Sequence, residues 1–174
     1  MNGVPEGAPI RASGEYQAVA ASISRIATHL DLASDPRERA QAALELLLED
    51  SGAAEGFLLG LCNGELVLRA RIGTAELSAS MLALAKKYLA DQCRVDELTL
   101  VTELEQESRS EWTVDERFVY RPVLLSHEVD AALAVTGLAL LRAPLGGYFR
   151  HPAATAVQLS RLVWPEEQVA SVER

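Results

Sequence analysis

The sequence predicts an α+β protein in which amphipathic helices flank a central antiparallel β-sheet of about five to six strands. Several segments carry apolar residues at spacings of three and four, which is the helical period. Two apolar runs are joined by Asn63-Gly64, the favoured pair for a two-residue hairpin, and such a hairpin requires antiparallel pairing. Pairs of predicted strands are separated by helices, which favours a mixed α+β layer and excludes a parallel Rossmann sheet.

The length and the charge of the chain limit its organisation and its partners. Its 174 residues suit one domain. The 16 Lys and Arg residues are outnumbered by 25 Asp and Glu residues, which gives a net charge of −9. We expect no nucleic acid and no anionic membrane as a partner, because both require clustered basic side chains. Because the sequence shows no secretory signal and no long apolar run, we expect a cytoplasmic protein.

The first predicted helix carries the clearest apolar seam. Residues 1–13 are rich in Pro and Gly and are expected to form a flexible leader. The helix follows over 15–32, and its seam consists of Tyr16, Val19, Ile23, Ile26 and Leu30. The spacing resembles a coiled coil but lasts only two heptads. Two interpretations remain open: the helix packs on its own domain, or these five residues pair with their copies in a homodimer.

The second helix and the first hairpin have distinct local signals. Ser34 or Asp35 can cap a helix over 36–50, and Gly52 suits the position after its end. The run 56–62 is apolar on both faces, as a central strand is.

The strand after the Asn63-Gly64 turn alternates, so that one face meets the core and the other meets water. Its predicted inward face consists of Leu66, Leu68, Ala70 and Ile72.

The second half of the chain alternates between regular segments and an acidic loop. The expected elements are a helix over 74–92 capped by Thr74, strands over 98–101 and 118–125, a turn over 126–130, a central strand over 131–141 and a helix over 152–164. Residues 102–117 are expected to form a mobile acidic loop anchored by Trp112. The tail over 165–174 is polar.

This order of elements resembles that of a GAF domain, over residues 14–164. Residues 36–62 are similar to the opening helix and first strand of that family. Residues 120–141 are similar to its late strand pair, in which a glycine, here Gly137, stands among aliphatic residues. The chain also looks similar to the GAF domains attached to bacterial serine/threonine kinases and other signalling proteins. The resemblance implies a GAF/PAS-like fold and a regulatory role.

The resemblance also implies where a ligand would bind. GAF domains often hold small molecules between the sheet and the helices on its distal side, but the cyclic-nucleotide signature is absent here. Bilin-binding members pair a Cys with a His, whereas Cys93 has no adjacent His and Cys62 lies at a hairpin tip. The residues that could line a pocket are Phe57, Leu59, Trp112, Tyr120 and Val135. Plain core packing is the alternative for all five.

No group of residues has the pattern of a catalytic or metal site. The three histidines, His29, His127 and His151, lack further ligands at metal-binding spacing. Ser126, His127 and Asp130 fall on one predicted turn, whereas a catalytic triad brings its members together from different directions. Methionine sulfoxide reductases of the GAF family use three grouped cysteines, and this chain has two. We therefore expect no enzyme activity, no metal and no cofactor.

Together these features predict a stand-alone, non-catalytic GAF-like module that acts through protein contact or dimerisation. Its expected partner is another signalling protein, such as a kinase or a regulator, or a second copy of itself. The alternative is a sensor that binds a cytosolic small molecule in the GAF pocket.

Overall fold

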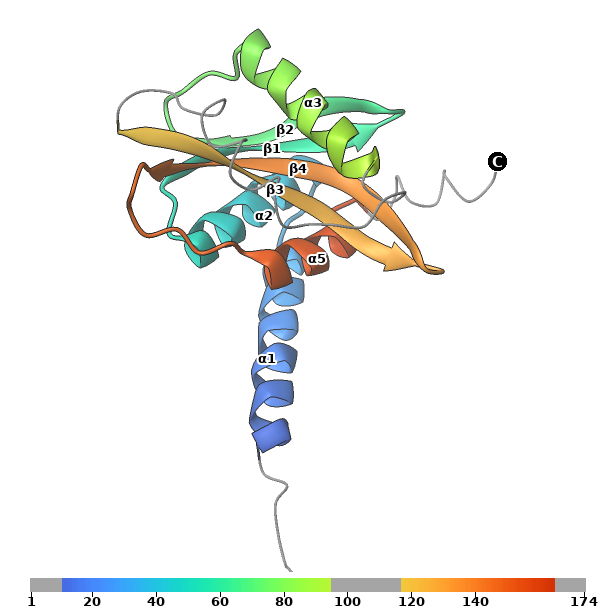
Figure 1. Ribbon diagram of the computed structural model, residues 1–174. Coiled ribbons are helices and arrows are strands. Elements are labelled where there is room, and N and C mark those ends of the chain that lie inside the picture. Colours follow the sequence, from blue (N-terminus) through green and yellow to red (C-terminus); the bar gives the residue numbers. More distant parts are fainter. Residues whose placement is uncertain (1–10, 95–116, 165–174) are drawn as a thin grey trace, which may run out of the picture.

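Figure 1 shows a computed structural model of the chain, which describes residues 11–94 and 117–164. The helices and strands, in chain order, are α1 (Arg11–Asp31), α2 (Pro36–Ser51), β1 (Glu55–Cys62), β2 (Glu65–Ile72), α3 (Ala79–Arg94), β3 (Phe118–Val129), β4 (Ala132–Pro144) and α5 (Ala153–Leu162).

The four strands form one open sheet in the order β2-β1-β4-β3, and every neighbouring pair is antiparallel. The predicted α+β class is therefore confirmed, and β1 and β4 lie in the middle of the sheet as the sequence predicts. The structure describes four strands rather than five or six. The strand predicted over 98–101 and the acidic loop over 102–117, apart from Arg117, lie outside the described residues.

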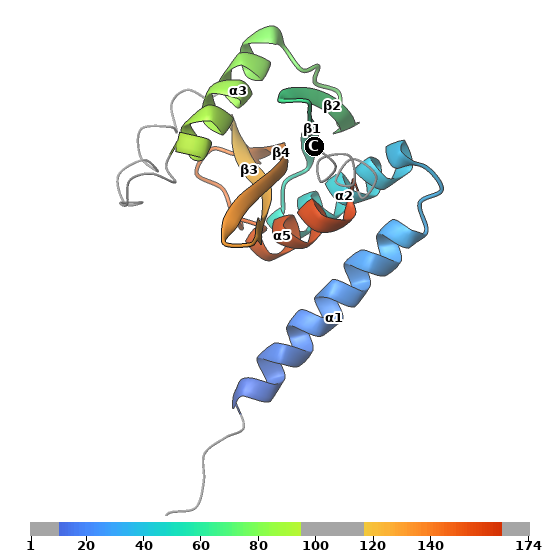
Figure 2. The same cartoon turned by 90° about the vertical axis from the view of Figure 1, so that its right-hand side faces the viewer.

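The sheet is covered on both faces by helices. Figures 1 and 2 show α1, α2 and α5 on one face and α3 on the other. On the first face, side chains such as Leu58 and Leu141 pack with Leu47 of α2 and Leu159 of α5. On the second face, a smaller cluster that includes Phe57, Leu59, Tyr120, Leu138 and Leu140 packs against Ala85 of α3. The alternation of side chains along each central strand supplies both clusters.

The predicted caps of α2 are confirmed. Asp35 is the N-cap, and its Oδ1 accepts a hydrogen bond of 2.8 Å from the Glu38 amide. The Glu38 carboxylate in turn accepts a hydrogen bond from the Ser34 amide. Hydrogen bonds from the Ser34 hydroxyl and amide lower the pKa of Glu38. At the other end Gly52 adopts a φ of 75°, a left-handed conformation that favours glycine.

The hairpin between β1 and β2 is also confirmed at its turn. Asn63 and Gly64 have φ values of 52° and 81°, as a type I′ turn requires. The strand that follows differs from the prediction, because the register shifts between Leu58 and Leu59 and leaves Arg69 as an extra residue.

This bulge divides the predicted inward face of β2 between the two faces of the sheet. Leu66 joins the cluster on the α3 side, whereas Ala70 and Ile72 join the cluster on the α2 and α5 side. Leu68, which was expected to point inward, is exposed. A single inserted residue reverses every later side chain along a strand.

Other element boundaries differ as well. α1 begins at Arg11 and α3 at Ala79, four residues before and five residues after the predicted starts at positions 15 and 74. Ser78 rather than Thr74 caps α3, because its hydroxyl accepts a hydrogen bond of 3.2 Å from the Met81 amide. β3 continues to Val129, so residues 126–129 belong to the strand and the turn lies at Asp130 and Ala131.

Two glycines form a close contact in the centre of the sheet. Gly60 of β1 and Gly137 of β4 are directly paired, and a Cβ atom built on either would lie within 3.3 Å of the Trp164 ring. A Cβ on Gly137 would also lie 2.5 Å from the Leu59 carbonyl oxygen. The missing side chains therefore make room for the indole of Trp164, which is buried where the chain leaves α5.

Candidate functional site

The candidate site lies on the N-terminal part of α1. Figures 1 and 2 show this helix leaving the body, so that its first turns stand clear of every other labelled element. Its last turns pack against α5 and α2. The helix has 21 residues, and the 15 residues over 11–25 span about 22 Å at 1.5 Å per residue. We call residues 11–25 the arm.

The predicted seam of α1 continues from the arm onto the body. Ile26 and Leu30 are buried at 1% and 3% exposure in the cluster beneath the sheet. Ile23 lies one turn earlier and is 37% exposed. Tyr16 and Val19 belong to the same helix, and their side chains lie outside the described residues. Packing on the chain's own domain therefore accounts for Ile26 and Leu30, and it leaves more than a third of Ile23 exposed.

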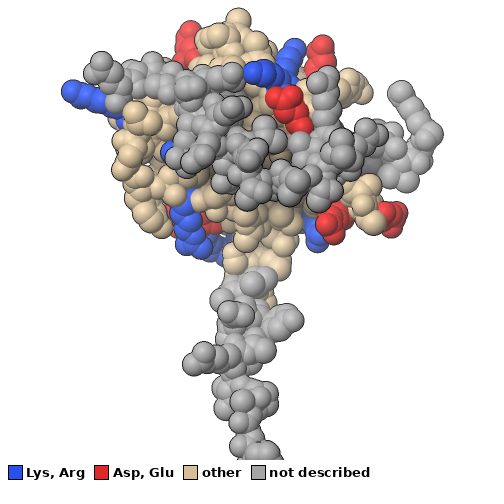
Figure 3. Space-filling view, in the orientation of Figure 1, with Lys and Arg blue, Asp and Glu red and all other residues tan. Residues whose placement is uncertain are grey.

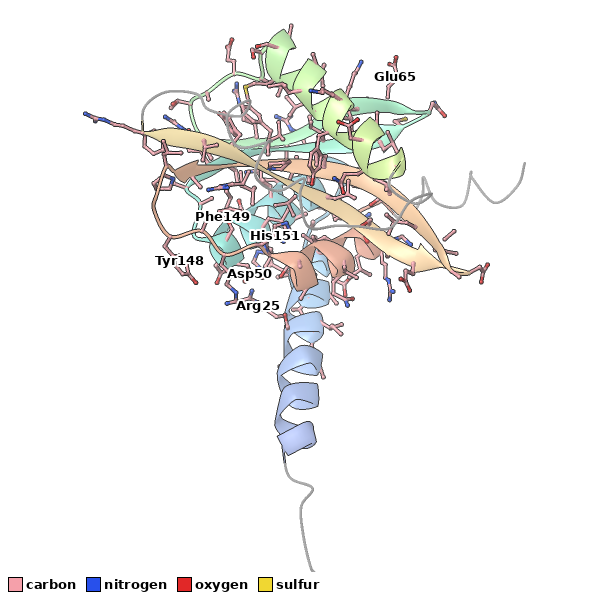
Figure 4. The ribbon with its side chains drawn as sticks, viewed as in Figure 1. Arg25, Asp50, Glu65, Tyr148, Phe149 and His151 are labelled. Carbon is pink, nitrogen blue, oxygen red and sulfur yellow. The ribbon has the colours of Figure 1, made fainter. Side chains whose placement is uncertain are left out.

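A polar contact holds α1 where the arm leaves the body. Arg25 lies 3.0 Å from the Asp50 carboxylate and 3.4 Å from the Glu49 carboxylate, both in the last turn of α2. Asp50 also accepts a hydrogen bond from the hydroxyl of Thr155, which is buried on α5. Asp50 thus connects three helices. Figure 4 shows Arg25 and Asp50 next to each other beneath the sheet.

Two acids in the last turn of α2 face the negative end of the helix dipole, which is unfavourable without a cation. α2 has no basic residue in its own last turn, and Arg25 supplies the charge from α1. Sequence reasoning missed this contact. The signal that could have suggested it is the Glu49-Asp50 pair, which points to a cation from elsewhere in the chain.

The connection between β4 and α5 covers the same end of α2. The Arg150 amide donates a hydrogen bond of 3.1 Å to the Ser51 carbonyl. A Cβ atom on Gly52 would lie 3.5 Å from the ring of Tyr148, and Figure 4 shows Tyr148 and Phe149 on this side of the body. Tyr148 is exposed, while Phe149 packs against the core and lies 5.7 Å from the Arg121 guanidinium.

The structure brings together three of the five pocket candidates. Phe57 and Leu59 of β1 and Tyr120 of β3 share the α3 face of the sheet, and the rings of Phe57 and Tyr120 are 5.8 Å apart. All three are buried at 3% exposure or less. Val135 pairs with Ser126 beyond the β3–β4 bulge and is not a member of this cluster, and Trp112 lies outside the described residues.

A polar group borders this apolar cluster. Arg142 and Glu55 face each other across β4 and β1 and form an ion pair of 3.0 Å. The Arg142 guanidinium also lies 4.2 Å from the centre of the Phe118 ring. Burial raises the pKa of Tyr120, while nearby Arg142 lowers it and Glu55 raises it, with burial the largest effect. These contacts hold the edge of the core together and leave the phenol neutral at physiological pH.

His127 and Ser160 form a contact that the sequence did not suggest. Nδ1 of His127 lies 3.0 Å from Oγ of Ser160. Because Ser160 donates its hydroxyl hydrogen to the Val157 carbonyl, we assign the Nδ1–H tautomer, in which the ring donates to Ser160. Ser160 is fully buried, and its hydroxyl is already committed. The contact joins β3 to α5 and does not have the polarity of a nucleophile and base pair.

The environment of His127 predicts a dependence of stability on pH. Burial, and secondarily the charge of Arg161, lowers its pKa from the usual 6.5. The unfolded chain therefore binds more protons, and the free energy of unfolding should fall as the pH drops below about 6.5. Denaturant unfolding at a series of pH values should show a weaker fall in His127→Gln. The control His29→Gln, at an exposed histidine, should behave as wild type, and equal slopes in all three proteins would contradict the assignment.

No metal site is apparent in the part of the chain that the structure describes. Within residues 11–94 and 117–164, no group of three or more His, Cys, Asp or Glu side chains could hold a metal ion. Cys62 and Cys93 are both free thiols.

Charge and hydropathy give two further observations on the described surface. On the face shown in Figure 3, described side chains of both signs are interspersed around the body. Among the described helices, none combines the length and the apolar character that crossing a membrane would require.

Comparisons with known proteins return no family model, no curated protein and no solved structure that matches this chain. A functional proposal therefore depends on the arrangement of its own residues.

Proposed function

We propose that the protein is a GAF-like regulatory module without catalytic activity, and that it acts through protein contacts made by the arm of α1. The observation that carries this proposal is the seam of α1, which is buried at Ile26 and Leu30 but continues onto a helix that stands clear of the body. A contact surface that projects from a folded core reaches a partner without rearranging that core.

The energetics of an isolated helix support the proposal. A helix of about 15 residues is marginal in water, because most helical stability in proteins comes from packing. The arm also includes Gly14, Val19 and Ile23, which have lower helix propensity than Ala or Leu. The arm is therefore expected to gain stability from a partner.

Support for the GAF-like part of the proposal is more general. A glycine stands among aliphatic residues in a central strand, as the resemblance implies, and helices cover both faces of an antiparallel sheet. The remaining one or two strands of a GAF/PAS-like sheet would have to come from outside the described residues. The expected signalling partner is a kinase, another regulator or a second copy.

The proposal predicts that a substitution in the arm abolishes partner capture. Wild type, Ile23→Asp and Ser24→Asp would be immobilised and exposed to cytosolic extract of the source cells. Both substitutions add one negative charge to exposed neighbouring positions, but only position 23 lies on the seam. At least one protein should be retained by wild type and Ser24→Asp and lost with Ile23→Asp. Identical sets from all three baits would contradict the proposal.

The alternative function is sensing of a small molecule on the α3 face of the sheet. Burial of Phe57, Leu59 and Tyr120 gives it no particular support, since plain core packing explains their positions. The melting temperature of the same protein with added ligands distinguishes the two functions. A ligand at about 100 times its dissociation constant stabilises a protein by about 2.7 kcal/mol, so a raised melting temperature with a nucleotide, haem, an amino acid or a 2-oxoacid would favour the sensor.

A further inference from the structure

We infer that α3 is a helical flap: it opens away from the sheet while the rest of the domain stays folded, and its opening uncovers the apolar face of the central strands. The inference goes beyond the proposed function, because α3 and α1 lie on opposite sides of the sheet. It depends on how unequally the two faces are packed, on how the helices of the other layer are held, and on the connection between β2 and α3.

α2 and α3 have the same length but bury very different shares of their side chains. Each helix has 16 residues. α2 buries seven of them, among them Ala43 and Leu47. Over residues 79–93 of α3, Ala85 is the one side chain that is buried, and apolar neighbours such as Met81 and Leu89 are only partly buried. Because apolar burial is the main term that holds a helix on a sheet, α3 is held less strongly than α2.

The helices of the opposite layer are also fastened by polar contacts. Asp50 of α2 lies 3.0 Å from Arg25 of α1 and accepts a hydrogen bond from Thr155 of α5. His127 of β3 lies 3.0 Å from the hydroxyl of Ser160 on α5. A movement of any one of these helices breaks contacts with another element. We therefore expect this layer and the sheet to open only when the whole domain unfolds.

The connection between β2 and α3 provides a hinge. Residues 73–78 form neither helix nor strand. The connection begins at Gly73, whose φ of 109° lies in a range that residues with a side chain rarely adopt. Loop segments of this kind absorb the changes in φ and ψ that a hinged element requires. α3 can therefore turn away from the sheet without displacing β2.

The face beneath α3 is the apolar side of the central strands. Phe57 and Leu59 of β1 and Leu138 and Leu140 of β4 lie there, and each is exposed by 1% or less. Their burial means that α3 is closed in the structure described, so the open form is the minor state of an equilibrium. An apolar molecule that binds this face would raise the population of the open form, because it binds that form better than the closed one.

Thiol labelling compares α3 directly with α2. Ala85→Cys and Ala43→Cys would each be combined with Cys62→Ser and Cys93→Ser, and both alanines are fully buried. A buried thiol reacts with an aromatic disulfide reagent only when the structure around it opens. Ala85→Cys should react at least about 100-fold faster than Ala43→Cys, because local opening requires less free energy than global unfolding. Its rate should also depend only weakly on urea, because opening of α3 exposes less surface than global unfolding does.

The same experiment contains the results that would overturn the inference. One is an equal rate at the two positions. The other is a fast reaction of Ala85→Cys that shows the full urea dependence of global unfolding, which Ala43→Cys reports. Circular dichroism checks that both proteins are folded.

Neighbouring positions on β4 test whether the opening uncovers the sheet. Leu138 belongs to the α3 side and Ala139 to the α2 and α5 side, and both are fully buried. In the same background, Leu138→Cys should show the weak urea dependence expected for α3, and Ala139→Cys the strong dependence of global unfolding. The urea dependence decides rather than the rate, because a shortened core side chain also lowers stability. A strong dependence at both positions would contradict the inference.

Hydrogen exchange of the wild-type protein tests the inference without any substitution. A detached helix of 16 residues is marginal in water, so opening should also expose the amide groups of α3. Amides in the middle of α3 should exchange at least about 100-fold faster than amides in the middle of α2. Equal protection of the two helices would overturn the inference, and the proposed function of the arm would be unaffected by that result.

Discussion

Gly137→Ala should destabilise the protein by about 3 kcal/mol, at the upper end of the usual cost of overpacking. The new methyl group would lie 2.5 Å from the Leu59 carbonyl oxygen and 3.0 Å from the Trp164 ring. Neither neighbour can move easily, because one belongs to the backbone of a central strand and the other is a buried indole. The loss is large against the 5–15 kcal/mol of a typical domain, and denaturant unfolding followed by circular dichroism would measure it.

Two other glycines provide a graded comparison. A methyl group at Gly60 would meet the Arg69 side chain at 2.9 Å and Trp164 at 3.3 Å, and a long side chain can move aside. Gly60→Ala should therefore cost about 1 kcal/mol. Gly64 has nothing within 4 Å and a φ of 81°, which asparagine tolerates, so Gly64→Asn should change stability by less than about 0.5 kcal/mol. Equal costs at positions 137 and 60 would show that the Leu59 carbonyl is not the limiting contact.

These glycines also show how far the sequence could be interpreted. Gly137 was recognisable in the sequence as a glycine within an apolar strand. The reason for a glycine there is that a tryptophan packs over two paired glycines, and this depends on the register between β1 and β4. Register is a long-range property, and the period of a strand does not reveal which residue of another strand lies opposite. The ion pair between Glu55 and Arg142 was missed for the same reason.

Local features of the structure were predicted correctly where the chemistry of neighbouring residues determines them. The cap at Asp35, the left-handed Gly52 and the Asn63-Gly64 turn each depend on a few neighbouring residues. The inward face of β2 was wrong because one inserted residue, Arg69, has no signature in an otherwise alternating strand. Likewise, the turn predicted over 126–130 was placed too early, because the polar residues Ser126 and His127 continue β3 and pair with Val135 and Ala134 of β4.

The candidate site was predicted in its residues but not in its arrangement. The apolar seam of α1 was evident from its spacing, and both a helix packed on its own domain and a helix paired with its copy fitted that pattern. The structure divides the seam at Arg25, because the contacts that bind α1 to the body begin there. Those contacts come from α2 and α5, and no spacing within α1 could indicate them.

Asp50→Ala should cost about 2 kcal/mol of stability, because it removes the acceptor of a buried hydroxyl and the closer partner of Arg25. Glu49→Ala is the matched control on the same turn of α2. The Glu49 carboxylate lies 3.4 Å from Arg25 and the side chain is 65% exposed. Glu49→Ala should therefore change the free energy of unfolding by close to zero. A cost that is the same for both variants would show that Asp50 acts only as a surface charge.

A double-mutant cycle can separate the two contacts of Asp50. Thr155→Val removes the hydroxyl and preserves the shape of the side chain, so its coupling to Asp50→Ala measures the hydrogen bond between α2 and α5. The corresponding cycle with Arg25→Ala measures the contact between α2 and α1. If Asp50 fixes the direction in which the arm leaves the body, Asp50→Ala should also speed hydrogen exchange in α1 around Arg25 and weaken partner capture by the arm, although Asp50 lies outside the seam. An Asp50→Ala protein that is less stable but captures partners as wild type does would show that Asp50 stabilises the body without affecting the arm.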